Sequence, residues 1–189
     1  EPRAASGASG AARADKVVLG KVQRFADAVD TDAIIPGQFC HLVKLEDLGA
    51  KCFHFVRPEF VERAKQGATI VVAGEGWGSG SSREQAVWAL QGAGIQAIVA
   101  RSYAFIHKRN LVNEALPYLV IRDEEFFKLA AEGEALAVDL ATGKVTHTAS
   151  GRVFQGEAPT PMVQRLTQEG GLVAAIKRHG GKVFDALAG

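Results

Sequence analysis

The chain has 189 residues, of which 47% are hydrophobic and 23% charged, and this composition suits a single globular domain with its own core. Because 22 basic residues balance 21 acidic ones, no net field would recruit nucleic acid or an anionic membrane surface. No stretch approaches the ~20 consecutive apolar residues that a membrane span needs.

Residues 1–15 (EPRAASGASGAARAD) are rich in Ala, Ser, Gly and Arg and have no apolar periodicity, so we expect them not to pack. This composition is typical of the end of an organellar transit peptide, and the missing initiator Met fits a trimmed precursor. A disordered tail is the alternative. In a eukaryote the first interpretation places the protein in the plastid stroma, with the cytoplasm or the mitochondrion as alternatives, and residues 16–189 remain as one domain.

The first part of this domain predicts one strand, a loop and short helices. Residues 16–22 (KVVLGKV) are rich in β-branched side chains and indicate a strand. Residues 27–37 predict a loop that ends in Pro36 and Gly37. Residues 45–52 favour a helical turn, and residues 58–65 favour a helix with a proline in its first turn.

The middle of the chain predicts a strand, a loop, a helix and a second strand. Residues 69–73 and 96–100 are continuous apolar runs, which are typical of strands buried on both faces. Between them lie a glycine-rich loop, residues 74–80, and a helix to about Gln91 that Ser81 or Ser82 can cap. This order predicts a right-handed crossover between parallel strands.

The last part of the chain changes from parallel strands and helices to hairpins. Residues 103–114 predict a helix, residues 118–121 a third strand, and residues 123–132 a helix capped by Asp123. An antiparallel meander and two closing helices then occupy residues 135–139, 144–148, 152–154, 161–169 and 172–178. The fold class is therefore α/β with a mixed sheet.

The most informative segment is the glycine-rich loop with the serines and the arginine that follow it. Glycines at positions 74, 76, 78 and 80 let the backbone approach a ligand closely and adopt positive φ angles. The start of the next helix offers free N–H groups and the positive end of its dipole. Arg83 adds a guanidinium that suits a carboxylate or a phosphate. These residues predict an anion site and leave the identity of the anion open.

Nucleotide-binding motifs fit this loop poorly. It lacks the lysine and the glycine spacing of a P-loop, and no glycine stands at the last place of the dinucleotide fingerprint G-x-G-x-x-G. Arg101, at the end of the next predicted strand, can in principle read a 2′-phosphate, so a nucleotide-binding module stays as a non-enzymatic alternative. A structural glycine turn with a serine cap explains neither the repeated glycines nor the adjacent arginine.

Three blocks of sequence resemble the swivel domain of aconitase-family hydro-lyases. Residues 80–84 (GSSRE), after an apolar strand and a Gly-Glu-x-x-Gly loop, are similar to the family signature. Residues 30–36 (DTDAIIP) resemble the Asp-Thr-Asp-x-Ile-Ile-Pro motif of the isopropylmalate isomerase and homoaconitase small subunits. Residues 101–110 (RSYAFIHKRN) resemble a third family stretch, and the blocks keep the family's order and spacing.

The resemblance covers the chain from about Lys16 to its end, which is the size of a free-standing small subunit. It implies a three-layer β/β/α swivel domain with a mixed, barrel-like sheet. It also implies a hydro-lyase that isomerises 2-isopropylmalate to 3-isopropylmalate by dehydration and rehydration, in leucine biosynthesis. Small subunits of homoaconitase or of related malate and citraconate hydratases are the alternatives, and an orphan regulatory swivel module is a non-enzymatic one.

In this family the first serine of Ser-Ser-Arg is the base, which assigns that role to Ser81. The resemblance also implies that Ser82 and Arg83 bind a substrate carboxylate, and we expect the backbone N–H groups of residues 81–83 to complete the anion site. A serine hydroxyl needs concentrated positive potential to act as a base, and a helix N-terminus with an arginine supplies it. Supporting loop residues in the same comparison are Asp30, Thr31, Asp32, Gly76, Gly78 and Gly80.

In the family the hydroxyl leaves with the help of a [4Fe–4S] cluster that cysteines hold. This chain has only Cys40 and Cys52, so it cannot supply three cysteine ligands, and we expect it to bind no metal. Its enzyme-like pattern favours free thiols over a disulfide between them. The resemblance therefore implies a large partner subunit that carries the cluster, a small dicarboxylate as substrate, and no activity of either subunit alone.

Substrate choice in the family is attributed to the loop after Ile-Ile-Pro, here with Phe39, Cys40, His41 and Leu42 as the substrate contacts. Homoaconitase-like subunits resemble Tyr-Leu-Arg-Thr there, and the loss of that arginine favours an uncharged side group such as isopropyl. His41 weakens this inference because it can be protonated. Trp77, at the apex of the glycine loop, is expected outside the deep core, against the partner or over the substrate.

Overall fold

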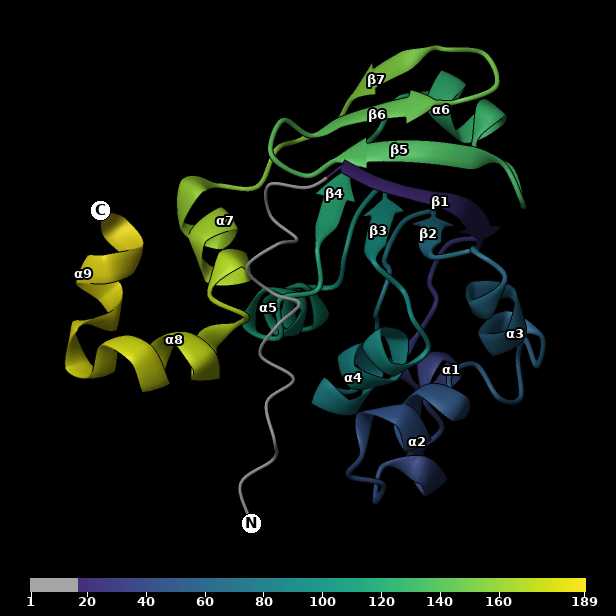
Figure 1. The fold of residues 1–189 in the computed structure, drawn as a ribbon. Coiled ribbons are helices and arrows are strands. Elements are labelled where there is room, and N and C mark those ends of the chain that lie inside the picture. The colour runs from purple at the N-terminus through teal and green to yellow at the C-terminus, as the bar shows by residue number, and fades with distance from the viewer. Residues whose placement is uncertain (1–16) are drawn as a thin grey trace.

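The computed structural model describes residues 17–189, which form one mixed sheet with helices packed around it (Figure 1). Its strands are β1 (Val17–Arg24), β2 (Ile70–Ala73), β3 (Ala97–Ala100), β4 (Tyr118–Val120), β5 (Ala135–Asp139), β6 (Lys144–His147) and β7 (Val153–Gln155). They lie in the order β4-β3-β2-β1-β5-β6-β7. The expected tail or transit-peptide remnant, residues 1–15, lies outside the described residues, and so does the plastid expectation that rests on it.

The four strands from β1 to β4 run parallel, with Val22 opposite Ile70 and Ile70 opposite Ala97. Every residue of β2 and β3 is buried, as their apolar runs predicted. Alternate side chains enter two different cores: Val71 and Ile98 face the helices, whereas Ile70 and Ala97 face the antiparallel strands. The parallel pairing predicted for the strands on either side of the glycine loop is confirmed.

The sheet changes direction at β1, because β1 also pairs antiparallel with β5. The strands β5, β6 and β7 form the predicted antiparallel meander. In Figure 1 they curl over the parallel strands, with α6 (Glu124–Leu129) beside them. Leu136, Val145 and Phe154 pack in one core with side chains of β2 and β3. Two strand layers and one helical layer confirm the expected β/β/α architecture with a mixed, barrel-like sheet.

The remaining helices are α1 (Thr31–Ile34), α2 (Leu45–Ala50), α3 (Phe60–Lys65), α4 (Glu84–Gly92), α5 (Phe105–Asn113), α7 (Pro161–Gln168), α8 (Leu172–His179) and α9 (Val183–Ala188), with 3-10 turns at Gly37–Phe39 and Gly180–Lys182. The loop predicted over residues 27–37 contains α1, because the Asp30 side chain caps this turn by accepting from the Ala33 N–H at 2.7 Å. Pro58 precedes α3 instead of lying in its first turn. No pattern predicted α9. None of the helices within residues 17–189 is long and apolar enough to cross a bilayer.

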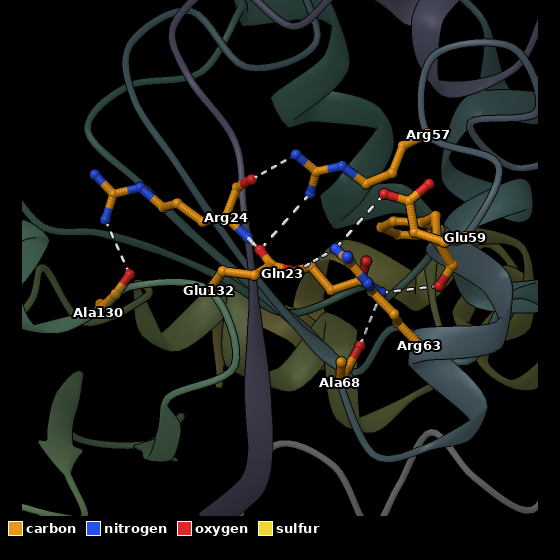
Figure 2. A network of polar contacts seen from close by, with 9 residues as sticks. Gln23, Arg24, Arg57, Glu59, Arg63, Ala68, Ala130 and Glu132 are labelled. Carbon is orange, nitrogen blue, oxygen red and sulfur yellow. Dashed lines mark hydrogen bonds and ion pairs between the residues drawn. The ribbon is translucent and has the colours of Figure 1, made fainter.

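A network of charged side chains ties the end of β1 to α3 and to the turn before β5 (Figure 2). The Glu132 carboxylate accepts from the Arg24 backbone N–H at 2.5 Å and from the Arg63 side chain at 2.7 Å. The Arg57 side chain donates to the Arg24 carbonyl at 2.8 Å. Directly after this network the chain enters the loop that carries residues 30–36, so the network holds the base of that loop.

Candidate active site

The three sequence blocks meet at one edge of the sheet. Residues 30–36 follow β1, the glycine loop follows β2, and residues 101–104 follow β3. These strands are parallel neighbours, so their carboxyl ends share an edge, which is where α/β sheets bind ligands. Isolated bridges join Asp30 to Ser79 and Trp77 to Tyr103. The glycine loop therefore lies between the other two blocks.

On one side, the glycine loop is hydrogen-bonded to residues 29–31. The Gly78 N–H donates to the Val29 carbonyl at 2.7 Å, and the Thr31 N–H donates to the Ser79 carbonyl at 2.9 Å. The Thr31 hydroxyl donates to the Ser81 carbonyl at 2.9 Å. Thr31 is only 1% exposed, so its two contacts lie on the interior side of the loop.

On the other side, the loop is hydrogen-bonded to residues 102–104. The Gly76 N–H donates to the Ser102 hydroxyl at 2.9 Å, the Trp77 N–H to the Ser102 carbonyl at 3.2 Å, and the Ala104 N–H to the Trp77 carbonyl at 2.9 Å. Trp77 is fully buried, and its ring lies 5.5 Å from that of Phe25. The expectation that Trp77 lies outside the deep core was wrong, because the backbone is bonded on both sides here and the indole packs inward among aromatic rings.

Ser81 and Ser82 are exposed and lie between the glycine loop and α4. The prediction that one of them caps α4 was wrong, since the cap position is Arg83, whose backbone is extended, and the helix begins at Glu84. No side chain caps this helix. Within residues 17–189 the backbone N–H groups from Gly80 through Gln85 find no acceptor. Free N–H groups beside a helix N-terminus suit an anion.

Arg83 lies at this turn with its guanidinium already oriented. Its side chain is 24% exposed, forms an ion pair with Asp32, and donates from Nη1 to the Ile35 carbonyl at 3.2 Å. Within the described residues, Nη2 and Nε have no acceptor, so that edge of the guanidinium can take a carboxylate. Asp32 therefore supports the site through Arg83.

The loop predicted to select the substrate begins beside Arg83, because Gly37 lies against the Arg83 guanidinium. The side chains of this loop differ in their exposure to solvent. Phe39, Cys40 and Leu42 are half-buried and pack against the core beneath α4. His41 is exposed, and its Nδ1 lies 2.8 Å from the Gln38 carbonyl, which can only accept, so Nδ1 donates and Nε2 is left for a ligand.

His107 of α5 supports the glycine loop from the interior. It is 2% exposed, and a Cβ added at Gly78 would lie 2.2 Å from its Cγ. Gly78 has a φ of +80°, so both the conformation and the contact require glycine there. Burial lowers the pKa of His107 from 6.5 to about 4, so the imidazole is neutral near pH 7. His107 belongs to the third sequence block, residues 101–110, but nothing in that block distinguished it from an ordinary packed histidine.

Arg101, the residue that kept nucleotide binding open, is engaged elsewhere. Its guanidinium donates to both carboxylate oxygens of Glu124, at 2.5 and 2.9 Å, and lies 4.0 Å from the centroid of Phe127. The hydrogen bond to Glu124 raises the pKa of Arg101. A guanidinium paired on both nitrogens with a carboxylate is not free to bind a phosphate, so the geometry speaks against a nucleotide-binding module.

The cysteines do not fit an iron–sulfur site. Both are free thiols, as the composition predicted; Cys52 is 1% exposed, and burial raises the pKa of its thiol. Across the described part of the chain, no group of three or more His, Cys, Asp or Glu side chains could hold a metal ion.

Comparisons with known proteins point to one family. The model of the aconitase C-terminal domain matches residues 15–124. An aconitase of Alternaria alternata is 39% identical over 171 residues, covering 90% of this chain, but the chain spans only 20% of that protein. The methanogen homoaconitase small subunit of Methanothermobacter thermautotrophicus is 36% identical and matches 83% of this chain and 89% of its own length. The 3-isopropylmalate dehydratase small subunit 1 of Methanopyrus kandleri is 36% identical, with 89% and 98% covered.

A solved structure shares the whole architecture. The crystal structure of 3-isopropylmalate dehydratase from Methanocaldococcus jannaschii superposes with a TM-score of 0.80 at 32% sequence identity. The match covers 92% of this chain and all of the other one.

Proposed function

The chain belongs to the aconitase C-terminal domain family, and from this premise we propose that it is the small subunit of a two-subunit hydro-lyase that isomerises 2-isopropylmalate to 3-isopropylmalate. Its matches to separate small subunits, over 89% and 98% of their lengths, support the two-subunit form. This isomerisation belongs to leucine biosynthesis.

One observation carries the proposal: an exposed serine pair and a partly exposed arginine lie on a turn whose N–H groups, from Gly80 through Gln85, have no acceptor in residues 17–189. A dicarboxylate substrate needs donors for its carboxylates and a base for a carbon-bound proton. Arg83 and the free N–H groups supply the donors. Ser81 supplies the hydroxyl, in the positive potential of the same donors and of the N-terminus of α4.

In the proposed reaction Ser81, as its alkoxide, takes a proton from the substrate carbon next to the one that bears the hydroxyl. The hydroxyl departs as hydroxide, so that hydroxide and the proton held by Ser81 Oγ together equal one water, and an alkene remains. Hydroxide then adds to the other carbon, and Ser81 Oγ returns its proton to the first hydroxyl-bearing carbon to give the isomer. Arg83 holds one carboxylate through Nη2 and Nε, and Ser82 donates to the same group. Asp30, Thr31, Asp32, Gly76, Gly78 and Gly80 keep the loops in place for these contacts.

The departure of the hydroxyl requires a Lewis acid. The residues of this chain do not suit the binding of an iron–sulfur cluster for that role, because the chain has only two cysteines and one of them is buried. We assign that part, a [4Fe–4S] cluster, to the large partner subunit. The free small subunit is then half of an active site, and we expect no turnover without its partner.

The choice of isopropylmalate rests on the loop after Pro36. Phe39, Cys40 and Leu42 provide apolar or weakly polar surface, and no permanently charged side chain stands among them or at His41. A homocitrate-type substrate, with a further carboxylate, would require a cation there, for which Lys51, whose Nζ lies 5.2 Å from the centroid of the Phe39 ring, and His41 are the candidates. Homoaconitase and related malate or citraconate hydratases are therefore the second choice.

The test is to reconstitute the chain with a cluster-bearing large subunit and to assay 2-isopropylmalate, homocitrate and citrate side by side. We expect the highest kcat/KM with 2-isopropylmalate. Replacement Ser81→Ala should lower kcat by about 10³-fold or more with an unchanged melting temperature, because it removes the base. The control is Ser150→Ala, an exposed serine in the β6–β7 turn, which should retain full activity. Full activity of Ser81→Ala would refute the role of Ser81.

A further inference from the structure

We propose that Thr31 is a positioning residue for the reaction, because its two hydrogen bonds set the direction of the peptide groups around Ser81. This inference rests on the proposed function. Thr31 donates twice into the serine loop: from its backbone N–H to the Ser79 carbonyl and from its hydroxyl to the Ser81 carbonyl, each at 2.9 Å. The two acceptors are the carbonyls of Ser79 and Ser81, so Gly80 lies between the two hydrogen-bonded residues.

The planarity of the peptide group turns these contacts into an orientation. In a trans peptide the C=O and the following N–H point in opposite directions. Because Thr31 holds the carbonyls of Ser79 and Ser81 toward the interior, the N–H groups of Gly80 and Ser82 point away from it, toward the exposed side. Neither N–H has an acceptor among residues 17–189, so both remain available to a ligand. Gly80, between Ser79 and Ser81, has a φ of +93°, a conformation that favours glycine.

The hydroxyl bond also strengthens the donor on the exposed side. A hydrogen bond accepted by a peptide carbonyl polarises that peptide and makes its N–H a better donor. The Ser81 carbonyl belongs to the same peptide as the Ser82 N–H, so the Thr31 hydroxyl polarises a group next to the proposed base. Thr31 is 1% exposed and lies behind the loop, so it acts through the 81–82 peptide and not on the substrate.

The experiment compares two substitutions at Thr31 in the reconstituted complex. Thr31→Val keeps the shape of the side chain and removes the hydroxyl, whereas Thr31→Ser keeps the hydroxyl. We expect Thr31→Val to lower kcat by about 10- to 100-fold, as small misplacements of catalytic groups do, with a smaller rise in KM because the Ser82 N–H is displaced whereas Arg83 is untouched. Thr31→Ser should recover at least about a third of the wild-type kcat, since its hydroxyl can reach the same carbonyl.

A matched control is Thr167→Val in α7. Thr167 is also buried, and its hydroxyl donates to the Val163 carbonyl at 2.9 Å, far along the chain from the serine loop. Both valine variants lose one buried hydroxyl bond, but Thr167→Val should keep the wild-type kcat. A purely structural role for Thr31 would make the two variants alike in kcat as well, and that result would overturn the inference.

Failure of the proposed function gives a different outcome. A wild-type complex that turns over none of the three substrates would refute the hydro-lyase assignment. The crystal structure of the Thr31→Val chain then tests the inference without any assay. We expect the peptide between Ser81 and Ser82 to be rotated in this variant. The Ser81 carbonyl would then no longer point toward residue 31, and the Ser82 N–H would no longer face the exposed side. An unmoved peptide would overturn the positioning role.

Discussion

Acidification should destabilise this protein through His107, the buried histidine beneath the glycine loop. His107 is 2% exposed, and neither ring nitrogen has a hydrogen-bond partner within the described residues. Burial disfavours the imidazolium and lowers the pKa of His107 from 6.5 to about 4. Folding therefore requires the neutral ring, and protons bind the unfolded chain more tightly than the folded one.

The sign and size of the effect follow from linkage. Above the unfolded pKa of 6.5 the ring is neutral in both states and contributes nothing to the pH dependence. Between pH 6.5 and 4 only the unfolded state binds the proton, so the free energy of unfolding falls as the pH falls. The slope reaches about 1.4 kcal/mol per pH unit, and the loss sums to about 3 kcal/mol near pH 4. That is a large share of the about 5–15 kcal/mol that holds a typical domain.

The assay is urea unfolding followed by tryptophan fluorescence, at pH steps from 7.5 to 4.5, for wild type and His107→Phe. Carboxylates also titrate in this range, but their contribution is common to both proteins and cancels in the difference. We expect the stability difference to change by about 2.5 kcal/mol in favour of the variant between pH 7.5 and 4.5. A flat difference for His107→Phe would refute the reasoning, as would an NMR titration of His107 with a midpoint near 6.5.

Two further substitutions test the packing that supports the site. Gly78→Ala should lower the free energy of unfolding by about 3 kcal/mol or more, since it adds backbone strain and a Cβ 2.2 Å from the His107 ring. Gly94→Ala is the control, because Gly94 has a similar φ of +95° but open space around it, and it should cost only about 1–2 kcal/mol. Equal thermal shifts would show that the contact with His107 costs nothing. Glu132→Ala should lower the free energy of unfolding by about 1–2 kcal/mol, because it removes the acceptor for both the Arg24 N–H and the Arg63 side chain. Glu62→Ala, which loses only a contact with Gln66, is the control and should change stability by less than about 0.5 kcal/mol in urea unfolding.

The positions of most strands and helices could be predicted from the sequence, because the signals are local. The runs at residues 69–73 and 96–100 are too apolar and too short for anything but buried strands, and the alternation after residue 134 predicts hairpins. The prediction of an anion-binding turn near Ser81 and Arg83 also rests on local signals, the repeated glycines and the adjacent arginine. Two cysteines alone rule out a self-contained cluster site.

The tertiary structure decided how the site is supported and where its donors point. Asp123 caps α6, as the sequence predicted. In contrast, α4 begins at Glu84 and not at the serines, because Thr31, 50 residues away along the chain, donates a hydrogen bond to the Ser81 carbonyl. Trp77 is buried because residues 102–104 bond to its backbone, and Arg24 meets Glu132 across 108 residues. Propensity and periodicity act over a few residues, whereas these contacts depend on the path of the whole chain. The sequence therefore determined which residues we propose for the chemistry, and the fold determined which of their donors are free to take part in it.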